Sequence, residues 1–270
     1  QIEARIARIW NELLRSGGEI DRDADFFALG GDSLLAVRMS FLLEEEFGVP
    51  VRIEQLAVKL SIAELARFLS SSDSLPVSPI SDARLPDWLI DRLRGFLGNW
   101  PGTPALPDGL VRRVGAAREG IPVFWCMQHP EEAVGFERTI GTRFPSYAMR
   151  SGMFLLEYDT PLAEALADRY AEEIKQICPE GPLVIAGFCQ GVNIALAVTR
   201  SLVAEGRQVR VLAAADCNFA ELCGASPVPV PVALFAAVRS KFNPYRYFRY
   251  PEIGLRRLAP RGLRVEMIDT

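Results

Sequence analysis

Histidine is almost absent from this sequence: a single residue, His129, occurs among 270. The five cysteines are an odd number and include no Cys-x-x-Cys pair. Structural zinc sites are usually built from such pairs, and disulfide frameworks from an even number of cysteines. We therefore expect no metal, no disulfide framework and a reducing, cytoplasmic location.

The sequence also lacks long apolar runs and a starting methionine. No segment is long enough to span a bilayer as a helix, so we expect no membrane partner. The first residues, Gln1 to Arg5, already have an amphipathic helix pattern and do not resemble a signal peptide. The missing methionine indicates a fragment of a longer polypeptide.

Basic residues are not in excess. The chain has 30 Lys and Arg against 34 Asp and Glu, a net charge of −4, which argues against nucleic acid as a partner. The excess acid lies in residues 1–71, which hold 8 basic and 12 acidic residues. Such a small acidic segment suits a soluble carrier that meets several partners transiently, and we expect a monomer.

Hydrophobic periodicity divides the chain into two kinds of structure. Apolar residues at helical spacing predict helices at 2–16, 33–47 and 61–69, the last beginning with a capping box formed by Ser61 and Glu64. We predict an all-α, four-helix domain at 1–70. A linker follows at 71–109 and contains an amphipathic helix at 86–98.

The pattern changes near residue 110, where short apolar runs begin to alternate with helical segments. Alternation of this kind predicts a mostly parallel sheet with helices on both faces, in an α/β domain at 110–270 that we expect to be incomplete at its C-terminus. The predicted strands are 122–127, 153–156, 183–186, 209–215, 230–238 and 263–268, and the predicted helices are 162–177 and 190–205.

Ser33 lies at the start of an apolar helix, in the run Leu29-Gly30-Gly31-Asp32-Ser33-Leu34. The glycines allow a tight turn, and the free N–H groups of a helix N-terminus favour an attached phosphate. On this local pattern alone, a plain helix N-cap is the better-supported role for Ser33.

A resemblance to a known family favours the attachment role for Ser33 over the N-cap role. Residues 1–69 resemble a peptidyl-carrier domain of nonribosomal peptide synthetases through Ile9-Trp10, the block from Asp25 to Ala36, and Phe47-Gly48-Val49. The resemblance implies that Ser33 carries 4′-phosphopantetheine, attached by a phosphopantetheinyl transferase, with a peptidyl group held as a thioester. It also implies condensation and adenylation domains upstream in the same synthetase.

The run Gly187-Phe188-Cys189-Gln190-Gly191 lies between a predicted strand and a predicted helix. A nucleophile elbow has this form, because small residues two positions on either side of the nucleophile let strand and helix approach closely. The pattern predicts Cys189 as a nucleophile, with an inert buried cysteine as the alternative. The other cysteines are expected in the core or in loops, and Cys217 is a candidate for the pocket lining: Cys126, Cys178, Cys217 and Cys223.

Residues 110–270 resemble the type I thioesterase domain of such synthetases, an α/β-hydrolase, through segments 122–130, 179–189 and 212–216. The resemblance implies that Asp216 is the acid of a catalytic triad; a turn-forming aspartate is the alternative. It also implies an oxyanion hole made by the backbone N–H of Gln190 and one from the loop after His129, at Pro130 or Glu131.

The resemblance places the triad histidine in a loop after the last strand. Because 263–268 looks like that strand, we expect the histidine beyond Thr270, with His129 as the alternative base. It also implies a helical lid after the Asp216 strand, where only residues 217–229 intervene. We predict that the helix at 86–98 forms part of a rearranged lid; a docking helix with no role at the site is the alternative.

Most relatives carry serine where Cys189 stands. A cysteine thioester retains more driving force than an oxoester and suits closure of a strained ring. With a cysteine at this position, the domain resembles release domains that form β-lactam or β-lactone products, such as that of the sulfazecin-type monobactam synthetase. We predict β-lactam formation by a substrate nitrogen, with Arg138, Arg239 and Arg246 as candidates for binding an anionic group on it. The alternatives are β-lactone formation, macrocyclisation, hydrolysis, and a carrier fused to a catalytically dead docking domain.

Overall fold

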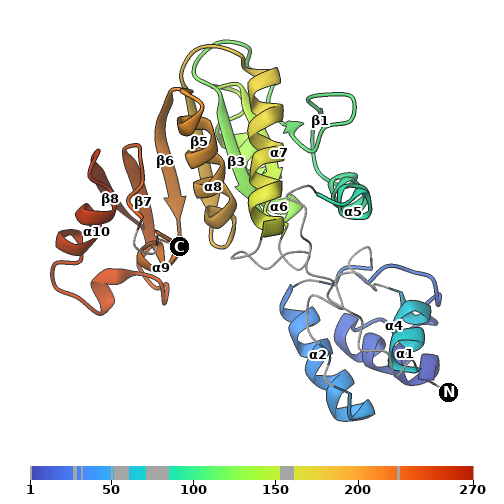
Figure 1. The fold of residues 1–270 in the computed structure, drawn as a ribbon. Coiled ribbons are helices and arrows are strands. Elements are labelled where there is room, and N and C mark those ends of the chain that lie inside the picture. Colours follow the sequence, from blue (N-terminus) through green and yellow to red (C-terminus); the bar gives the residue numbers. More distant parts are fainter. Residues whose placement is uncertain are drawn as a thin grey trace. The chain divides into compact units, whose positions relative to one another are not determined.

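The computed structural model contains two compact units (Figure 1). The first holds the described residues up to 70 and the second those from 85 on. The ranges that the structure describes are 2–26, 29–31, 33–49, 51, 61–70, 85–152, 161–223 and 226–269.

The first unit is helical. Its described elements are α1 (Ile2–Leu14), α2 (Ser33–Phe47) and α4 (Ile62–Ser70), so the three predicted helices are confirmed with small shifts at their ends. The predicted capping box is confirmed as well, because Ser61 N–H donates to the Glu64 carboxylate at 3.2 Å and Glu64 N–H donates to Ser61 Oγ at 3.2 Å. The described residues of this unit contain the helices α1, α2 and α4. The predicted four-helix arrangement therefore stays a prediction.

The second unit is built on one sheet with the strand order β1-β2-β4-β3-β5-β6-β7-β8. The strands from β3 to β8 pair in parallel, and only β1 and β2 join antiparallel at one edge, which confirms the predicted mostly parallel sheet. The strands are β1 (Thr103–Pro104), β2 (Arg112–Arg113), β3 (Val123–Met127), β4 (Ser146–Arg150), β5 (Leu183–Phe188), β6 (Val209–Ala215), β7 (Val232–Ala237) and β8 (Leu263–Ile268).

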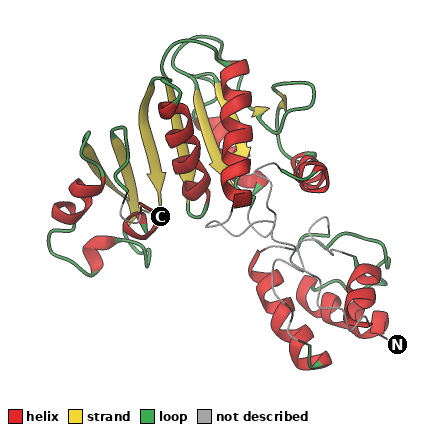
Figure 2. Ribbon diagram, in the orientation of Figure 1, coloured by secondary structure: helices red, strands yellow, loops and turns green. Residues whose placement is uncertain are grey.

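Helices cover both faces of this sheet (Figures 1 and 2). α7 and α8 pack against each other in front of the strands, and α6 lies behind them. Apolar residues of α8 such as Ile194 and Val198 are fully buried against the sheet. The helices are α5 (Asp87–Leu97), α6 (Pro130–Thr139), α7 (Pro161–Ile177), α8 (Gly191–Ala204), α9 (Phe219–Cys223) and α10 (Glu252–Leu258), with a 3-10 turn η1 (Pro244–Arg246).

β4 and α6 are among the elements of this unit that were not predicted from the sequence. β4 lies at Ser146–Arg150, and the strand predicted at 153–156 falls outside the described residues. α6 begins directly after the β3 loop with Pro130 at its first position and two glutamates in its first turn. That is a recognisable helix start, because proline fits the first helical position and acidic side chains suit the positive end of the helix dipole.

A buried carboxylate ties the edge of the sheet to α7. Glu173 is 1% exposed, and its carboxylate accepts the N–H groups of Leu110 at 2.8 Å and Val111 at 2.9 Å. Arg169 Nε donates to the same carboxylate at 2.8 Å. Because each carboxylate oxygen is used, the segment that leads into β2 is fixed against α7.

We expect Glu173→Gln to lower the free energy of unfolding by about 1.5–3 kcal/mol, since the amide loses charge-assisted hydrogen bonds in a buried place. The measurement is the midpoint and slope of urea unfolding followed by circular dichroism. Glu172→Gln is the matched control, because Glu172 is exposed and its ion pair with Lys175 lies at the surface. Equal shifts in both variants would contradict the role assigned to Glu173.

Candidate active site

Cys189 occupies a strained turn at the carboxyl end of β5. Its φ is 50°, in the left-handed region, where a non-glycine side chain costs about 1–2 kcal/mol. Its N–H donates to the carbonyl of Ala215 at 2.8 Å, and α8 begins two residues later at Gly191. The thiol is therefore held on a tight strand-to-helix turn and is partly exposed, as the elbow pattern predicts.

The two glycines of the motif are required by packing. A Cβ on Gly187 would lie 2.8 Å from backbone atoms of Val192, and a Cβ on Gly191 would lie 2.4 Å from the carbonyl oxygen of Cys126. Real Cβ atoms do not approach backbone atoms so closely. The glycines thus let α8 start directly against β5 and β3.

Asp216 lies beside the elbow. It directly follows β6, has a φ of 46° and donates its N–H to the carbonyl of Phe235 at 2.8 Å. Its Oδ1 atom is buried and has no hydrogen-bond partner among the residues that the structure describes. A buried acceptor without a donor is costly, which suits a carboxylate that receives the N–H of an imidazole.

The loop after β3 reaches the same edge of the sheet. Gln128 Nε2 donates to the carbonyl of Phe188 at 3.3 Å, so this loop is joined to the residue before the nucleophile. Pro130 has no backbone N–H, and its candidacy for the oxyanion hole is therefore wrong. Glu131 and Gln190 stand at the starts of α6 and α8, where N–H groups lack acceptors within the helix, and both keep the predicted role as proposals.

Glu132 is the most strongly perturbed carboxyl of this edge. Burial raises its pKa from 4.5 to about 7, against the opposing effect of the N–H groups of Gln128 and His129. The N–H of Gln128 donates to Glu132 Oε2 at 3.2 Å. No sequence pattern singles out this residue, because its raised pKa arises from burial at the start of α6.

His129 is the N-cap residue of α6 and lies two residues after the end of β3, the strand beside β5. It thus belongs to the same edge as Cys189. Its role as the alternative base stays a proposal, as does a triad histidine beyond Thr270.

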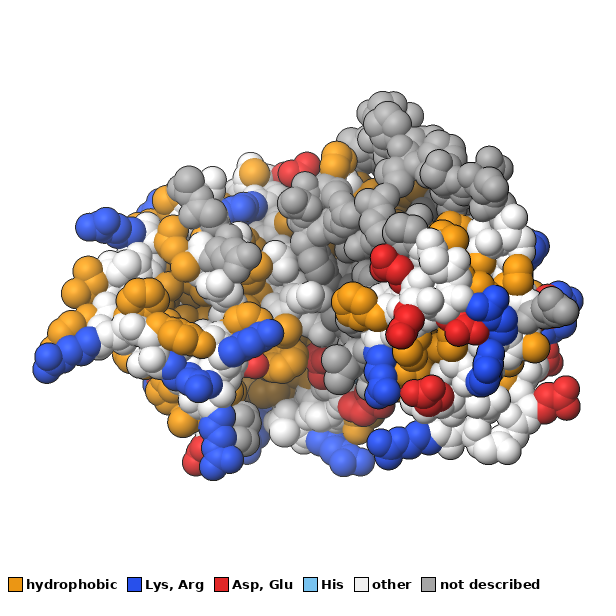
Figure 3. Space-filling view, turned by 90° about the horizontal axis from the view of Figure 1, so that it is seen from below, with side chains coloured by type: hydrophobic (Ala, Val, Ile, Leu, Met, Phe, Trp, Pro, Cys, Tyr) orange, Lys and Arg blue, Asp and Glu red, His pale blue; other side chains and the backbone are white. Residues whose placement is uncertain are grey.

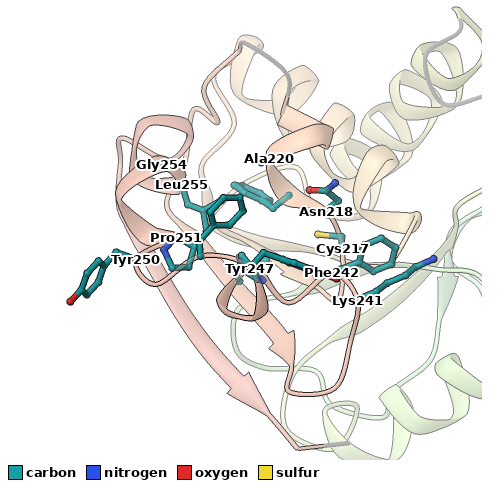
Figure 4. Close-up of a pocket in the computed structure, with 14 residues that line it drawn as sticks. Cys217, Asn218, Ala220, Lys241, Phe242, Tyr247, Tyr250, Pro251, Gly254 and Leu255 are labelled. Atoms are coloured by element: carbon teal, nitrogen blue, oxygen red, sulfur yellow. The ribbon is translucent and has the colours of Figure 1, made fainter.

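A cavity of about 400 Å³ lies next to these residues (Figure 4). Cys217 and Asn218, which directly follow Asp216, form one wall, and the connection between β7 and β8 forms the other. Cys217 lines this cavity, and its place in the active-site pocket stays a prediction, because Cys189 and Asp216 are not among the described lining residues. The described lining contains no residue of α5, so this cavity does not support the predicted lid role of that helix. It includes Lys241 but none of the three arginines predicted to bind an anionic group, so their role also stays a prediction.

In the first unit, the turn before Ser33 is fixed by an aromatic core. A Cβ on Gly31 would lie 2.4 Å from the ring of Phe26, which packs edge-on against Trp10 at 5.0 Å, and Gly30 has a φ of 96°. α2 begins at Ser33 and has no acidic residue in its first turn. A phosphate on this serine would therefore meet free N–H groups and the positive end of the helix dipole, so the residues present fit the predicted group.

Other sites are not indicated in the described ranges. These ranges contain no cluster of His, Cys, Asp and Glu that could hold a metal ion. None of their helices is both long and apolar enough to cross a membrane.

Comparison with known families agrees with this geometry. Residues 4–69 match the model of a phosphopantetheine attachment site, and residues 150–248 match the model of a thioesterase domain. The chain contains a carrier domain and a thioesterase domain. The carrier domain accordingly bears 4′-phosphopantetheine, covalently attached to a serine.

The relatives are large synthetases. The chain is 26% identical over 216 residues to surfactin synthase subunit 3 of Bacillus subtilis (strain 168), covering 80% of this chain and 14% of that protein. It is 29% identical over 226 residues to malpibaldin synthetase of Mortierella alpina, covering 80% of this chain and 3% of that protein. A solved four-domain nonribosomal peptide synthetase in its holo form, bound to AMP and glycine, matches with a TM-score of 0.47 and 16% identity, over 99% of this chain and 24% of that one.

We expect Gly191→Ala to destabilise the thioesterase domain by about 1–3 kcal/mol, because the added methyl group collides with the Cys126 carbonyl. Urea unfolding and the rate at which Cys189 reacts with a thiol reagent both report on the change. Gly135→Ala in α6 is the matched control, since nothing lies within 4 Å of its added Cβ. An unchanged unfolding midpoint in Gly191→Ala would contradict the close approach described above.

The pKa of Glu132 predicts an unusual dependence of stability on pH. Because the folded protein holds this proton up to about pH 7 and the unfolded chain only to about 4.5, stability contributed by the protonated carboxyl is present below pH 4.5 and is lost as the pH rises to 7. Glu132→Gln removes this titration. The unfolding free energy of wild type should therefore fall relative to that of Glu132→Gln between pH 4.5 and 7, measured by urea unfolding at each pH. Glu164→Gln, at an exposed position of α7, should run parallel to wild type; a constant difference between Glu132→Gln and wild type would refute the assignment.

Proposed function

We propose that this chain is the terminal carrier–thioesterase part of a nonribosomal peptide synthetase and that it releases a peptidyl group by ring closure at Cys189. The observation that carries the proposal is the left-handed turn at Cys189, bonded through its N–H to the residue before Asp216. A merely structural cysteine has no need of that strained conformation. Upstream condensation and adenylation domains would supply the substrate.

Ser33 is proposed as the serine that bears phosphopantetheine. When attached, that group supplies a thiol that holds the peptide as a thioester. A Cβ on Gly31 would collide with Phe26, so the chain passes close to the aromatic core just before α2. A phosphopantetheinyl transferase is the partner that this role requires.

The first chemical step would be acyl transfer to the thiolate of Cys189. Its sulfur attacks the thioester carbonyl of the substrate, a new C–S bond forms, and the thiol of the substrate leaves with a proton. The backbone N–H groups of Gln190 and Glu131 would stabilise the oxyanion. We propose that a histidine beyond Thr270 moves the proton and is oriented by Asp216, with His129 as the alternative.

The second step would be attack by a nitrogen of the bound peptide. The nitrogen forms a bond to the carbonyl carbon, its proton passes to the base, and the Cys189 sulfur leaves as a thiolate. A thioester suits this step because amines attack it faster than an oxoester, which supports a β-lactam product. Attack by a hydroxyl would give a β-lactone or a macrocycle, and attack by water would give the free acid.

The test is the mass of product released by the native-length protein loaded with its peptide. We expect a product one water lighter than the free acid from wild type, and a loss of release by a factor of about 10³ or more in Cys189→Ala. Cys189→Ser should stop ring closure or divert the peptide to the free acid. His129→Ala is the control for the base, since it should retain release when the triad histidine lies elsewhere.

Other outcomes decide between the alternatives. Free acid from both wild type and Cys189→Ser would establish a hydrolase and refute ring closure. No release from loaded wild type would favour the docking domain. A cyclic product containing the whole peptide would assign macrocyclisation.

A further inference from the structure

The cover of the site comes from an unexpected part of the chain. Only residues 216–231 join β6 to β7, and they contain the five-residue helix α9. The connection from β7 to β8 is longer: it spans residues 238–262 and contains η1 and α10. Both connections leave the carboxyl ends of their strands, at the edge of the sheet where Cys189 and Asp216 lie. The β7–β8 connection is the longer one and is therefore the better candidate to cover that edge.

This connection carries unusual surface chemistry. Tyr247, Phe248 and Tyr250 are 63%, 65% and 56% exposed. Hydrophobic and basic side chains are mixed on the face seen from below, at the left of Figure 3. Large apolar side chains left in water commonly mark a binding site.

The cavity is largely apolar. Its walls include Phe219, Leu234, Phe242 and Leu255, and no acidic side chain occurs among its described lining residues. A volume of about 400 Å³ is in the range of small-ligand pockets. Lys241 is its only cationic lining residue in the described ranges, and its ammonium lies 5.0 Å from the centre of the Phe242 ring. Such largely apolar walls favour an aromatic or branched apolar group.

Cys217 connects the cavity along the chain to the edge that holds Cys189 and Asp216. It lines the cavity, directly follows Asp216 and is 6% exposed. Burial is the main cause that raises the pKa of its thiol. The wall of the cavity therefore begins one residue after Asp216.

We infer that this cavity is the acyl pocket of the enzyme and that it selects an aromatic or branched apolar side chain on the residue whose carbonyl is bound to Cys189. The inference rests on the proposed thioesterase function. In Figure 4, Cys217 and Asn218, which follow Asp216 in the chain, lie on one side of the cavity, and Gly254 and Leu255 of α10 lie on the other. An acyl chain that extends from Cys189 past Cys217 would enter between Phe242 and Leu255.

Gly254 offers a way to test the pocket without disturbing the core. It lines the cavity, and an added Cβ would meet no atom within 4 Å. Gly254→Leu should therefore fold normally and fill part of the cavity. Gly135→Leu is the matched control, because Gly135 is also an exposed helical glycine with open space around its Cβ and does not line the cavity.

The experiment compares N-acetylcysteamine thioesters that carry acetyl or phenylacetyl groups, using the native-length protein. We expect wild type to prefer phenylacetyl over acetyl by about tenfold or more in kcat/KM. Gly254→Leu should lose most of that preference, because the added side chain raises KM for phenylacetyl more than for acetyl. Gly135→Leu should behave as wild type.

A binding measurement separates this inference from the proposed function. A phenethyl thioether of pantetheine cannot be cleaved, and its affinity for Cys189→Ala and for the Cys189→Ala, Gly254→Leu double variant can be measured by calorimetry. Weaker binding in the double variant supports the pocket even if wild type turns over no thioester. Equal affinity in both, or equal loss of acetyl and phenylacetyl turnover in Gly254→Leu, would overturn the pocket while leaving a catalytic Cys189 intact.

Discussion

One backbone hydrogen bond organises the site: the N–H of Cys189 donates to the carbonyl of Ala215 at 2.8 Å. It continues the parallel pairing of β5 and β6 by one residue beyond the last strand position. Cys189 and the residue before Asp216 are therefore held side by side. Cys189 directly follows β5 and Asp216 directly follows β6, and both have left-handed backbone conformations. The pairing of these strands in the sheet offsets the conformational strain energy of the two residues.

Close packing below the turn makes this arrangement rigid. Gly187 and Gly191 bring α8 against β5 and against the carbonyl of Cys126, where no side chain fits. Gln128 joins the β3 loop to Phe188, so the donors proposed for the oxyanion move with the elbow and not independently. A preorganised group of this kind stabilises charge without reorganising at the moment of reaction.

The cover of the edge determines what can reach it. Ring closure competes with hydrolysis, so a release domain that forms small rings must keep water from the acyl group. In the proposed arrangement, the aromatic β7–β8 connection, which lines the cavity, would provide this cover. The proposed specificity and the exclusion of water would then come from the same aromatic residues.

The sequence by itself determined the features that depend on local chemistry. The periodicity of α1, α2 and α4, the capping box of Ser61 and Glu64, and the parallel sheet follow from spacing and composition, and the elbow pattern located the strained turn at Cys189. Only the tertiary structure decided the rest, because it depends on contacts between residues far apart in the chain. The raised pKa of Glu132, the unpartnered oxygen of Asp216 and the cavity behind Cys217 arise where separate loops meet at one edge of the sheet.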